Sequence, residues 1–274
     1  MDRVLVKNGA TVTDVTHFVS TYTDFSYEID ITDTTEIYIG KMLPFNHFYI
    51  HTETVKNVVS SNMSLEYWDG SQFRDVASLT DETSDSAASL ALNGFVSWVP
   101  DKAYRWQEED SENIAELSTV NYYDLYWNRV TFSSTLTADI VLKYIGQLFC
   151  TDAELFVEFP QFSEEDWLDG FEANKTEWTA QRITASNLIA SKLRATDKIQ
   201  TKDQIMDRLG LRDTCVQQTA AIIYNRFGEG RVEERKEAGF EAASRLKYAF
   251  PKIDKDNNAR YNNKELSKTK HWTR

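Results

Sequence analysis

The hydrophobic pattern of the chain changes its period near residue 150. Before that point, short runs rich in Val, Ile, Thr and aromatic residues alternate with Asp, Thr, Ser and Asn, which is typical of strands. The expected strands are Val4–Val6, Glu36–Ile39, Phe45–His51, Ser64–Trp68, Phe73–Ala77, Gly94–Val99, Tyr122–Trp127 and Ile140–Ile145. After Pro160 apolar residues recur at helical spacing. This predicts an α+β protein with an N-terminal antiparallel β-sandwich or jelly-roll-like domain (1–150), a C-terminal α-helical domain (151–250) and an extended tail (251–274).

The sharpest local signal in the first half is an Asp-Gly pair. Asp69 and Gly70 stand between the runs Leu65–Trp68 and Ser71–Val76. Because both central residues of a two-residue hairpin loop need positive φ, Asp-Gly is a preferred pair there. The sequence therefore predicts a hairpin with a two-residue loop.

Helix boundaries in the second half are predicted from capping signatures. Three pairs have the spacing of helix N-caps: Ser163 with Asp166, Thr201 with Gln204, and Thr214 with Gln217. An apolar stripe of Trp178, Ala185, Ile189 and Leu193 predicts a long helix after the first pair. Gly210 should end a short helix, Gly228–Gly230 should break the chain, and a last helix should span 231–249 before Pro251.

Charge is distributed unevenly along the chain. Residues 1–150 hold 22 Asp and Glu against 9 Lys and Arg, whereas residues 151–274 hold 21 of each. The acidic first half disfavours sequence-specific binding to nucleic acid. The polar tail is basic and cannot fold by burial alone, so it is either a solvated tail or an arm that orders on a partner. Its candidate partner-binding residues are Lys252, Lys255, Arg260, Lys264, Lys268, Lys270, Trp272 and Arg274.

No catalytic or cofactor-binding motif is present, which favours a protein that is not an enzyme and takes no cofactor. His47 and His51 share one face of an expected strand, but a metal pair is less favoured than two partly buried imidazoles. Asp254–Glu265 has the ligand spacing of a calcium loop, yet Ala259 occupies its glycine position, so no metal is predicted. Trp68, Trp98 and Trp106 are expected in the core rather than on a sugar-binding face.

The remaining composition points to a reducing compartment and away from the membrane. The chain's two cysteines, Cys150 and Cys215, lie far apart in sequence and are expected as free thiols. No apolar run approaches the roughly 18 residues that span a bilayer. No secretory signal is visible after Met1.

Two stretches resemble proteins of tailed-phage particles. Leu65–Val76, Asp81–Thr83 and Gly94–Pro100 resemble a virion β-sandwich module that combines an aromatic-x-G hairpin, a D-x-T loop and a G-x-V-x-W-x-P strand. The helices around Gly228–Gly230, followed by a basic tail, look like head-to-tail connector (adaptor) proteins of the phage neck.

This resemblance implies a structural virion protein, assembled in the host cytoplasm, whose helical domains form a homo-oligomeric ring, usually of twelve. The C-terminal arm of such a protein inserts into the portal, and the added β domain could receive tail, collar or fibre proteins. The genome would pass through the ring without sequence-specific contact, and no membrane is involved. The alternative is a tail or baseplate protein whose β-sandwich binds glycan or a fibre, and a hydrolase with a carbohydrate-binding-like domain is a third possibility.

Overall fold

The computed structural model describes residues 2–22, 25–29, 35–53, 56–99, 106–137, 140–249, 251–255 and 257. The chain forms two compact units, one of residues up to Gly146 and one of Gln147 to Lys255, and each has a hydrophobic core of its own. The expected combination of helices with antiparallel sheets is confirmed, because the protein is mixed α/β with two antiparallel sheets.

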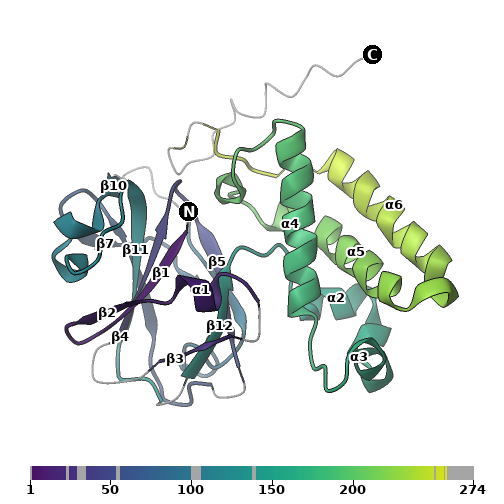
Figure 1. The fold of residues 1–274 in the computed structure, drawn as a ribbon, viewed down its shortest axis with the longest axis horizontal. Coiled ribbons are helices and arrows are strands. Elements are labelled where there is room, and N and C mark those ends of the chain that lie inside the picture. The colour runs from purple at the N-terminus through teal and green to yellow at the C-terminus, as the bar shows by residue number, and fades with distance from the viewer. Residues whose placement is uncertain are drawn as a thin grey trace. The chain divides into compact units, whose positions relative to one another are not determined.

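The larger sheet has the strand order β2-β1-β4-β11-β6-β7, with β10 paired to β11 (Figure 1). Every pairing in it is antiparallel, for example Val6 opposite Ile37 and Ile37 opposite Val130. Its strands are β1 (Arg3–Asn8), β2 (Thr11–Asp14), β4 (Thr35–Lys41), β6 (Met63–Trp68), β7 (Phe73–Asp75), β10 (Glu108–Glu109) and β11 (Leu125–Phe132).

The smaller sheet has the order β3-β12-β5-β9-β8 and is also antiparallel. Its strands are β3 (Tyr27–Ile29), β5 (His47–Thr52), β8 (Thr80–Asp81), β9 (Gly94–Ser97) and β12 (Ile140–Gly146). The described part of this unit also contains the short helices α1 (Thr16–Val19), η1 (Ser111–Asn113) and η2 (Ala115–Leu117).

Residues from both sheets share one hydrophobic core. Alternate residues of β1 and β4, such as Val6 and Ile37, meet Phe48 and Ile50 of β5 in one buried cluster. Side chains of the opposite parity, such as Trp127, form a second cluster with Ile114 and Leu117 around η1 and η2. Because successive strand residues point to opposite faces, these two clusters bury both faces of β1, β4 and β11.

All eight expected strands overlap an observed strand, although the one expected at Tyr122–Trp127 lies later, at Leu125–Phe132. The sequence pattern did not predict β2, β3, β8 and β10, which have two to four residues each. Runs this short carry too few residues for an alternating pattern to be recognised.

The predicted two-residue loop of the hairpin is wrong. Trp68 pairs with Phe73, so the loop contains the four residues from Asp69 to Gln72. Of the Asp-Gly pair only Gly70 has positive φ, at +92°. The Asp69 carboxylate accepts hydrogen bonds from the backbone N–H groups of Ser71 and Gln72, both at 2.9 Å. An Asp side chain can close a turn in this way without adopting positive φ itself.

The second unit is helical (Figure 1). Its elements are α2 (Asp152–Glu158), η3 (Pro160–Ser163), α3 (Glu165–Phe171), α4 (Thr179–Ala195), η4 (Lys202–Gln204), α5 (Leu209–Arg226), η5 (Gly228–Arg231) and α6 (Val232–Tyr248). α5 is the central helix, because it contacts both α4 and α6 and every residue of 214–221 except Gln218 is buried.

Several expected helix boundaries in this unit are wrong. The Ser163 hydroxyl donates to the carbonyl of Pro160 rather than capping α3, and the expected long helix is interrupted between α3 and α4. Gly210 lies in the first turn of α5, and Thr214 lies inside that helix, so neither marks a boundary. The break at Gly228–Gly230 and the last helix agree with the structure to within one residue.

Two further capping signatures have different outcomes. Thr151 and Glu154, which the sequence pattern did not single out, form a capping box at the start of α2. The Gln204 side chain accepts from the backbone N–H of Thr201, but the next element is the 3₁₀ turn η4 rather than a longer helix. A capping signature therefore marks the start of a turn without fixing the length of the helix.

Candidate functional site

The first residues of the expected C-terminal arm are part of the helical unit. The backbone N–H of Met206 donates to the carbonyl of Lys252, and that of Asp254 donates to the carbonyl of Gln204, both at 2.8 Å. Ile205 and Ile253 form an antiparallel bridge between these bonds, and Ile253 and Asp254 are buried. Residues 251–255 are therefore extended, as predicted for this region, and attached to the segment that precedes α5.

The structure places two of the eight candidate arm residues. Lys252 has a side chain that is 56% exposed, and its Nζ lies 3.7 Å from Asp207 Oδ2. Lys255 is also exposed. The other six lie outside the described residues: Arg260, Lys264, Lys268, Lys270, Trp272 and Arg274.

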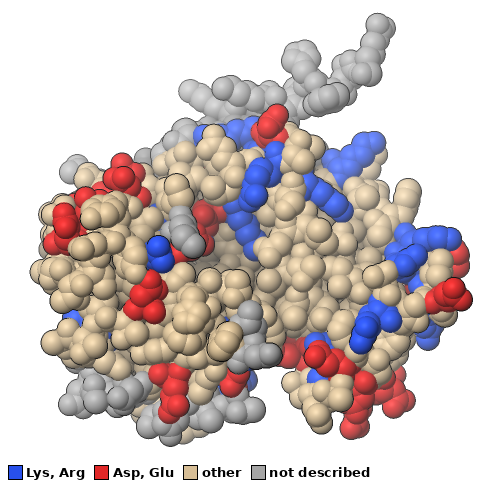
Figure 2. All heavy atoms as spheres, viewed as in Figure 1, with Lys and Arg blue, Asp and Glu red and all other residues tan. Residues whose placement is uncertain are grey.

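Further basic residues lie near this attachment point. Lys192 and Arg194 occupy the last turn of α4, where positive charge complements the negative end of the helix dipole. Lys198 follows α4, and Lys202 begins η4, next to the segment that pairs with residues 252–254. Figure 2 shows blue side chains gathered over this end of the helical unit. We call this set the basic surface: Lys192, Arg194, Lys198, Lys202, Lys252 and Lys255.

An acidic surface lies toward the opposite end of α4. Its members, Glu164, Glu165, Asp166 and Asp169, are exposed on or beside α3, and Figure 2 shows red side chains over that helix. Phe171 at the end of α3 packs edge-on against Trp178, the residue before α4, with ring centroids 5.1 Å apart. Since α4 has 17 residues, it separates the two surfaces by about 25 Å.

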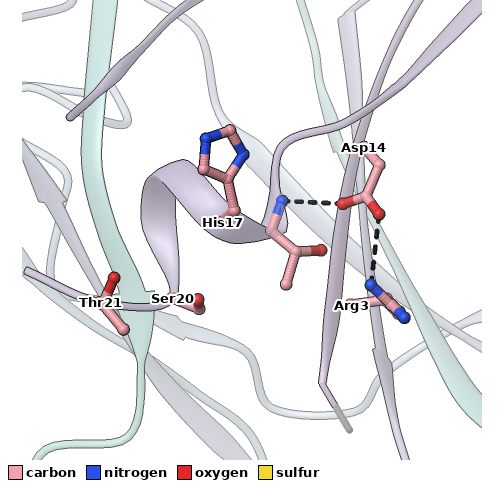
Figure 3. Close-up of a pocket in the computed structure, with 6 residues that line it drawn as sticks. Arg3, Asp14, His17, Ser20 and Thr21 are labelled. Atoms are coloured by element: carbon pink, nitrogen blue, oxygen red, sulfur yellow. Dashed lines mark hydrogen bonds and ion pairs between the residues drawn. The ribbon is translucent and has the colours of Figure 1, made fainter.

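An open hollow lies in the β unit. It measures about 370 Å³, and Arg3, Asp14 and His17 are among its lining residues (Figure 3). The Asp14 carboxylate accepts from the backbone N–H of Thr16 at 2.9 Å and pairs with Arg3 at 3.4 Å. The Tyr122 hydroxyl also donates to it.

These contacts decide what the hollow can do chemically. Burial raises the pKa of Asp14, but the hydrogen bonds from Thr16 and Tyr122 and the charge of Arg3 outweigh burial and lower that pKa below its ordinary value. A carboxylate held in its charged form by three partners is a poor general acid or base near neutral pH. The His17 ring packs on Phe18, with centroids 3.7 Å apart, and lies apart from Asp14 in Figure 3. We assign the hollow a structural role.

The other candidates from the sequence are core residues. His47 and His51 are both buried in β5, and the described residues contain no group of three or more His, Cys, Asp or Glu side chains that could hold a metal. Trp68 and Trp98 are buried, at 7% and 3% exposure, so they provide no exposed platform for a sugar. Trp106 packs partly buried against the same core. Of the expected calcium loop, Asp254 is buried and most of the remainder lies outside the described residues.

No protein-family model, curated protein or solved structure matches this chain. Within the described residues, no helix has both the length and the apolar character needed to cross a membrane. The surfaces that remain for a functional argument are the attached C-terminal segment, the basic and acidic surfaces, and the outer faces of α4 and α6.

Proposed function

We propose that this chain is a structural protein of a tailed-phage particle, a ring-forming head–tail connector subunit that links the portal to the tail. In this proposal the two antiparallel sheets form a sandwich domain, the helical unit forms the ring, and the C-terminal arm docks on the portal. The sequence resemblance supports the virion setting. The arrangement of α4, α5 and α6 supports ring formation, and it is the observation on which the proposal mainly rests.

The outer faces of α4 and α6 lie on opposite sides of α5 (Figure 1). A subunit with two different contact surfaces on opposite sides associates head to tail, and such contacts close into a ring when the rotation between subunits allows it. The arrangement of helices therefore suits the ring that the resemblance implies.

The outer face of α4 has the composition of a protein interface. From Ala180 to Ser191 its only charged residue is Arg182, which is buried, and the outward residues include Thr184, Asn187 and Leu188. One charge lies at the edge of this face, because Lys202 Nζ donates to Asn187 Oδ1 at 2.9 Å. Leu188 is 41% exposed. Depletion of charge distinguishes the centre of interfaces from ordinary surface, because solvated helix faces usually carry charged residues.

The outer face of α6 offers a large apolar side chain to such a surface. Phe240 is 73% exposed and lies opposite the buried Ala238 and Ala242, which face α5. Beside it, Lys236 pairs with Glu233 on the same helix at 2.9 Å, so these two charges partly neutralise each other. An exposed aromatic side chain of this size is a frequent interface anchor.

The charges at the ends of the two helices favour one orientation. The α4 face runs from the acidic surface to the basic surface, whereas α6 exposes Glu233, Lys236 and Glu237 in its first half, a net of one negative charge, and Lys247 near its end. If α6 of one copy lies antiparallel to α4 of the next, opposite charges meet at both ends. We therefore assign the occupant of the α4 face as α6 of a second copy of this chain.

The ring is tested by the mass of the full chain in solution and by negative-stain images. We expect closed rings for the wild type, and smaller species for Leu188→Glu and Phe240→Glu with unchanged circular dichroism. Val157→Glu is the matched control, because Val157 is 85% exposed on α2 and outside both faces. A wild type that stays monomeric, or forms two-fold dimers, at its highest soluble concentration would contradict the ring. Rings that survive both interface substitutions would contradict the assigned faces.

The arm is tested by truncation, and the structure fixes where the truncation should begin. Deleting 257–274 keeps the pairing of residues 252–254 with 204–206, so the chain should fold and form rings but fail to dock on the portal. Deleting 251–274 also removes that pairing and buried Ile253, and should lower stability as well. Tailed, infectious particles from the shorter deletion would show that the arm is only a solvated tail.

A further inference from the structure

The only two cysteines of the chain meet in the core of the helical unit. Cys150 directly precedes the first residue of the α2 capping box, and Cys215 lies in α5. Their sulfur atoms are 2.9 Å apart, and both residues are fully buried. The sequence alone predicts independent free thiols, because 65 positions separate the two residues in the chain.

The segments that carry the two sulfurs are both held in place. Arg182 of α4 donates from Nη1 to the carbonyl of Cys150 at 3.0 Å. The Thr219 hydroxyl donates to the carbonyl of Cys215 at 2.8 Å and lies 3.9 Å from the Cys150 sulfur. The Ser186 hydroxyl lies 3.4 Å from the Cys215 sulfur. The pair is therefore positioned by contacts from α4 and α5, rather than brought together by two mobile side chains.

We propose that Cys150 and Cys215 are a covalent modification site, which forms an intrachain disulfide when the chain meets a small-molecule disulfide such as oxidised glutathione. The sulfurs need to approach by only about 0.9 Å to reach the bond length of a disulfide. Nothing in this site depends on the proposed ring, so an experiment that contradicts one of the two proposals leaves the other untouched.

The reaction is a balanced thiol–disulfide exchange in two steps. One cysteine loses its proton, and its thiolate attacks a sulfur of glutathione disulfide, which releases one glutathione thiolate and leaves a mixed disulfide. The thiolate of the second cysteine then attacks the protein sulfur of that mixed disulfide and releases the second glutathione. The two cysteines together lose two protons and two electrons, and glutathione disulfide is reduced to two thiols.

Burial determines when this exchange can occur. Burial, together with the hydrogen bond to Cys215, raises the pKa of the Cys150 thiol, whereas hydrogen bonds from Cys150 and Ser186 outweigh burial and lower the pKa of Cys215. Cys215 is therefore the thiol that loses its proton first. Both sulfurs are out of reach of a dissolved oxidant while the unit is closed. Exchange should therefore be slow in the folded chain and fast during folding or local opening.

The cross-link would tie the start of α2 to α5 and close a loop containing α2, α3 and α4. Closing a loop of this length restricts the unfolded chain and stabilises the folded unit. If the chain acts in a particle that is assembled in reducing cytoplasm and persists outside the cell, the bond would form in the oxidising setting and hold the helical unit there.

The test compares oxidised and reduced full-length protein. One sample is refolded from urea with oxidised and reduced glutathione, which exposes both thiols to the oxidant, and a second is oxidised in the folded state. Each sample is then denatured without reductant and alkylated, and the mass of the intact protein is measured by mass spectrometry. We expect the refolded protein to lose two hydrogen atoms, take up no alkyl group and yield a peptide that joins Cys150 to Cys215.

Thermal unfolding provides the second measurement. The oxidised protein should unfold at a temperature at least about 10 °C above that of the reduced protein, because a long loop is closed. Cys150→Ala and Cys215→Ala are the matched controls, and neither should respond to oxidation. Refolded protein that keeps both thiols alkylatable, forms only bonds between chains, or is less stable when oxidised would overturn the proposal.

Discussion

Replacing Arg182 by Met should destabilise the helical unit more than any surface change on the same helix. The Arg182 side chain is 1% exposed and joins the first turn of α4 to the segment that begins α2. Its Nη1 donates to the Cys150 carbonyl at 3.0 Å, and its Nη2 donates to Thr179 at 2.6 Å and to the Asp152 carboxylate at 3.3 Å. Its Nε forms an ion pair with the same carboxylate at 2.8 Å. Methionine keeps the apolar stem of the side chain and removes all of these donors.

The size of the effect is set by the groups that lose a partner in the substitution. The fully buried Cys150 carbonyl loses a charged donor, which costs about 1–3 kcal/mol. Removing one partner of a buried ion pair costs about 3–5 kcal/mol in total. Because the Asp152 side chain is 20% exposed and water can partly replace its partner, the lower end applies. We expect a loss of about 3 kcal/mol, roughly a hundredfold in the unfolding equilibrium.

Urea unfolding of the full chain, followed by the helical circular dichroism signal, measures this loss, because the long helices all lie in the helical unit. Lys192→Met is the control, since it removes an exposed charge from the same helix and should change stability by less than about 0.5 kcal/mol. Arg182→Lys should fall between the two, because an ammonium cannot contact three acceptors in the planar geometry of a guanidinium. A loss below about 1 kcal/mol for Arg182→Met would refute the reasoning.

Three further outcomes are expected in the β unit. A Cβ at Gly94 would lie 2.4 Å from the backbone oxygen of Glu82, so Gly94→Ala should shift the backbone and lower stability by about 1–3 kcal/mol, measured by thermal unfolding. Gly70→Val should cost about 1–3 kcal/mol in the same assay, since φ at Gly70 is +92°, and an unchanged melting temperature would contradict this. Asp14→Asn should be less stable than wild type at neutral pH. That difference should disappear as the pH falls from the unfolded pKa of 3.8 through the lower folded pKa of Asp14, and a pH-independent difference would count against the assigned contacts.

The sequence predicted those elements that local pattern determines. Strands such as β4 and β5 are long, apolar and bounded by polar stretches, so they are visible without tertiary information. The final helix is bounded by Gly228–Gly230 on one side and Pro251 on the other, and the observed α6 agrees to within one residue. Backbone constraints of this kind act through neighbouring residues alone.

Boundaries set by tertiary contacts were not predictable in the same way. Thr151 with Glu154 and Ser163 with Asp166 have the same capping spacing, yet only the first pair caps a helix. Thr214 has an N-cap signature but lies inside α5, in its buried stretch. α5 packs against both α4 and α6. Burial of that stretch favours a continuous helix over the capped turn that local sequence would allow.

The candidate surfaces could not be predicted from the sequence, because they combine residues from segments that are far apart in the chain. Lys192 and Lys252 are 60 positions apart, and the pairing of residues 204–206 with 252–254 places Lys252 beside the segment that follows η4. The charge count of residues 151–274, with equal numbers of both signs, conceals an acidic and a basic surface at opposite ends of α4. The meeting of Cys150 and Cys215 is equally invisible at their separation in the chain.

The composition of α4 reflects different demands on its two sides. Its inner side carries Arg182 and Ser186, which fix the segments bearing the two cysteines, so polar residues stand where a simple amphipathic helix would be apolar. Its outer side carries Leu188 and uncharged residues where such a helix would be charged. A helix that only covers the core usually carries charged residues on its solvent side. α4 therefore contacts its own core through polar bonds, and its outer side offers the proposed ring contact a face whose own residues are uncharged and whose Asn187 side chain accepts from Lys202.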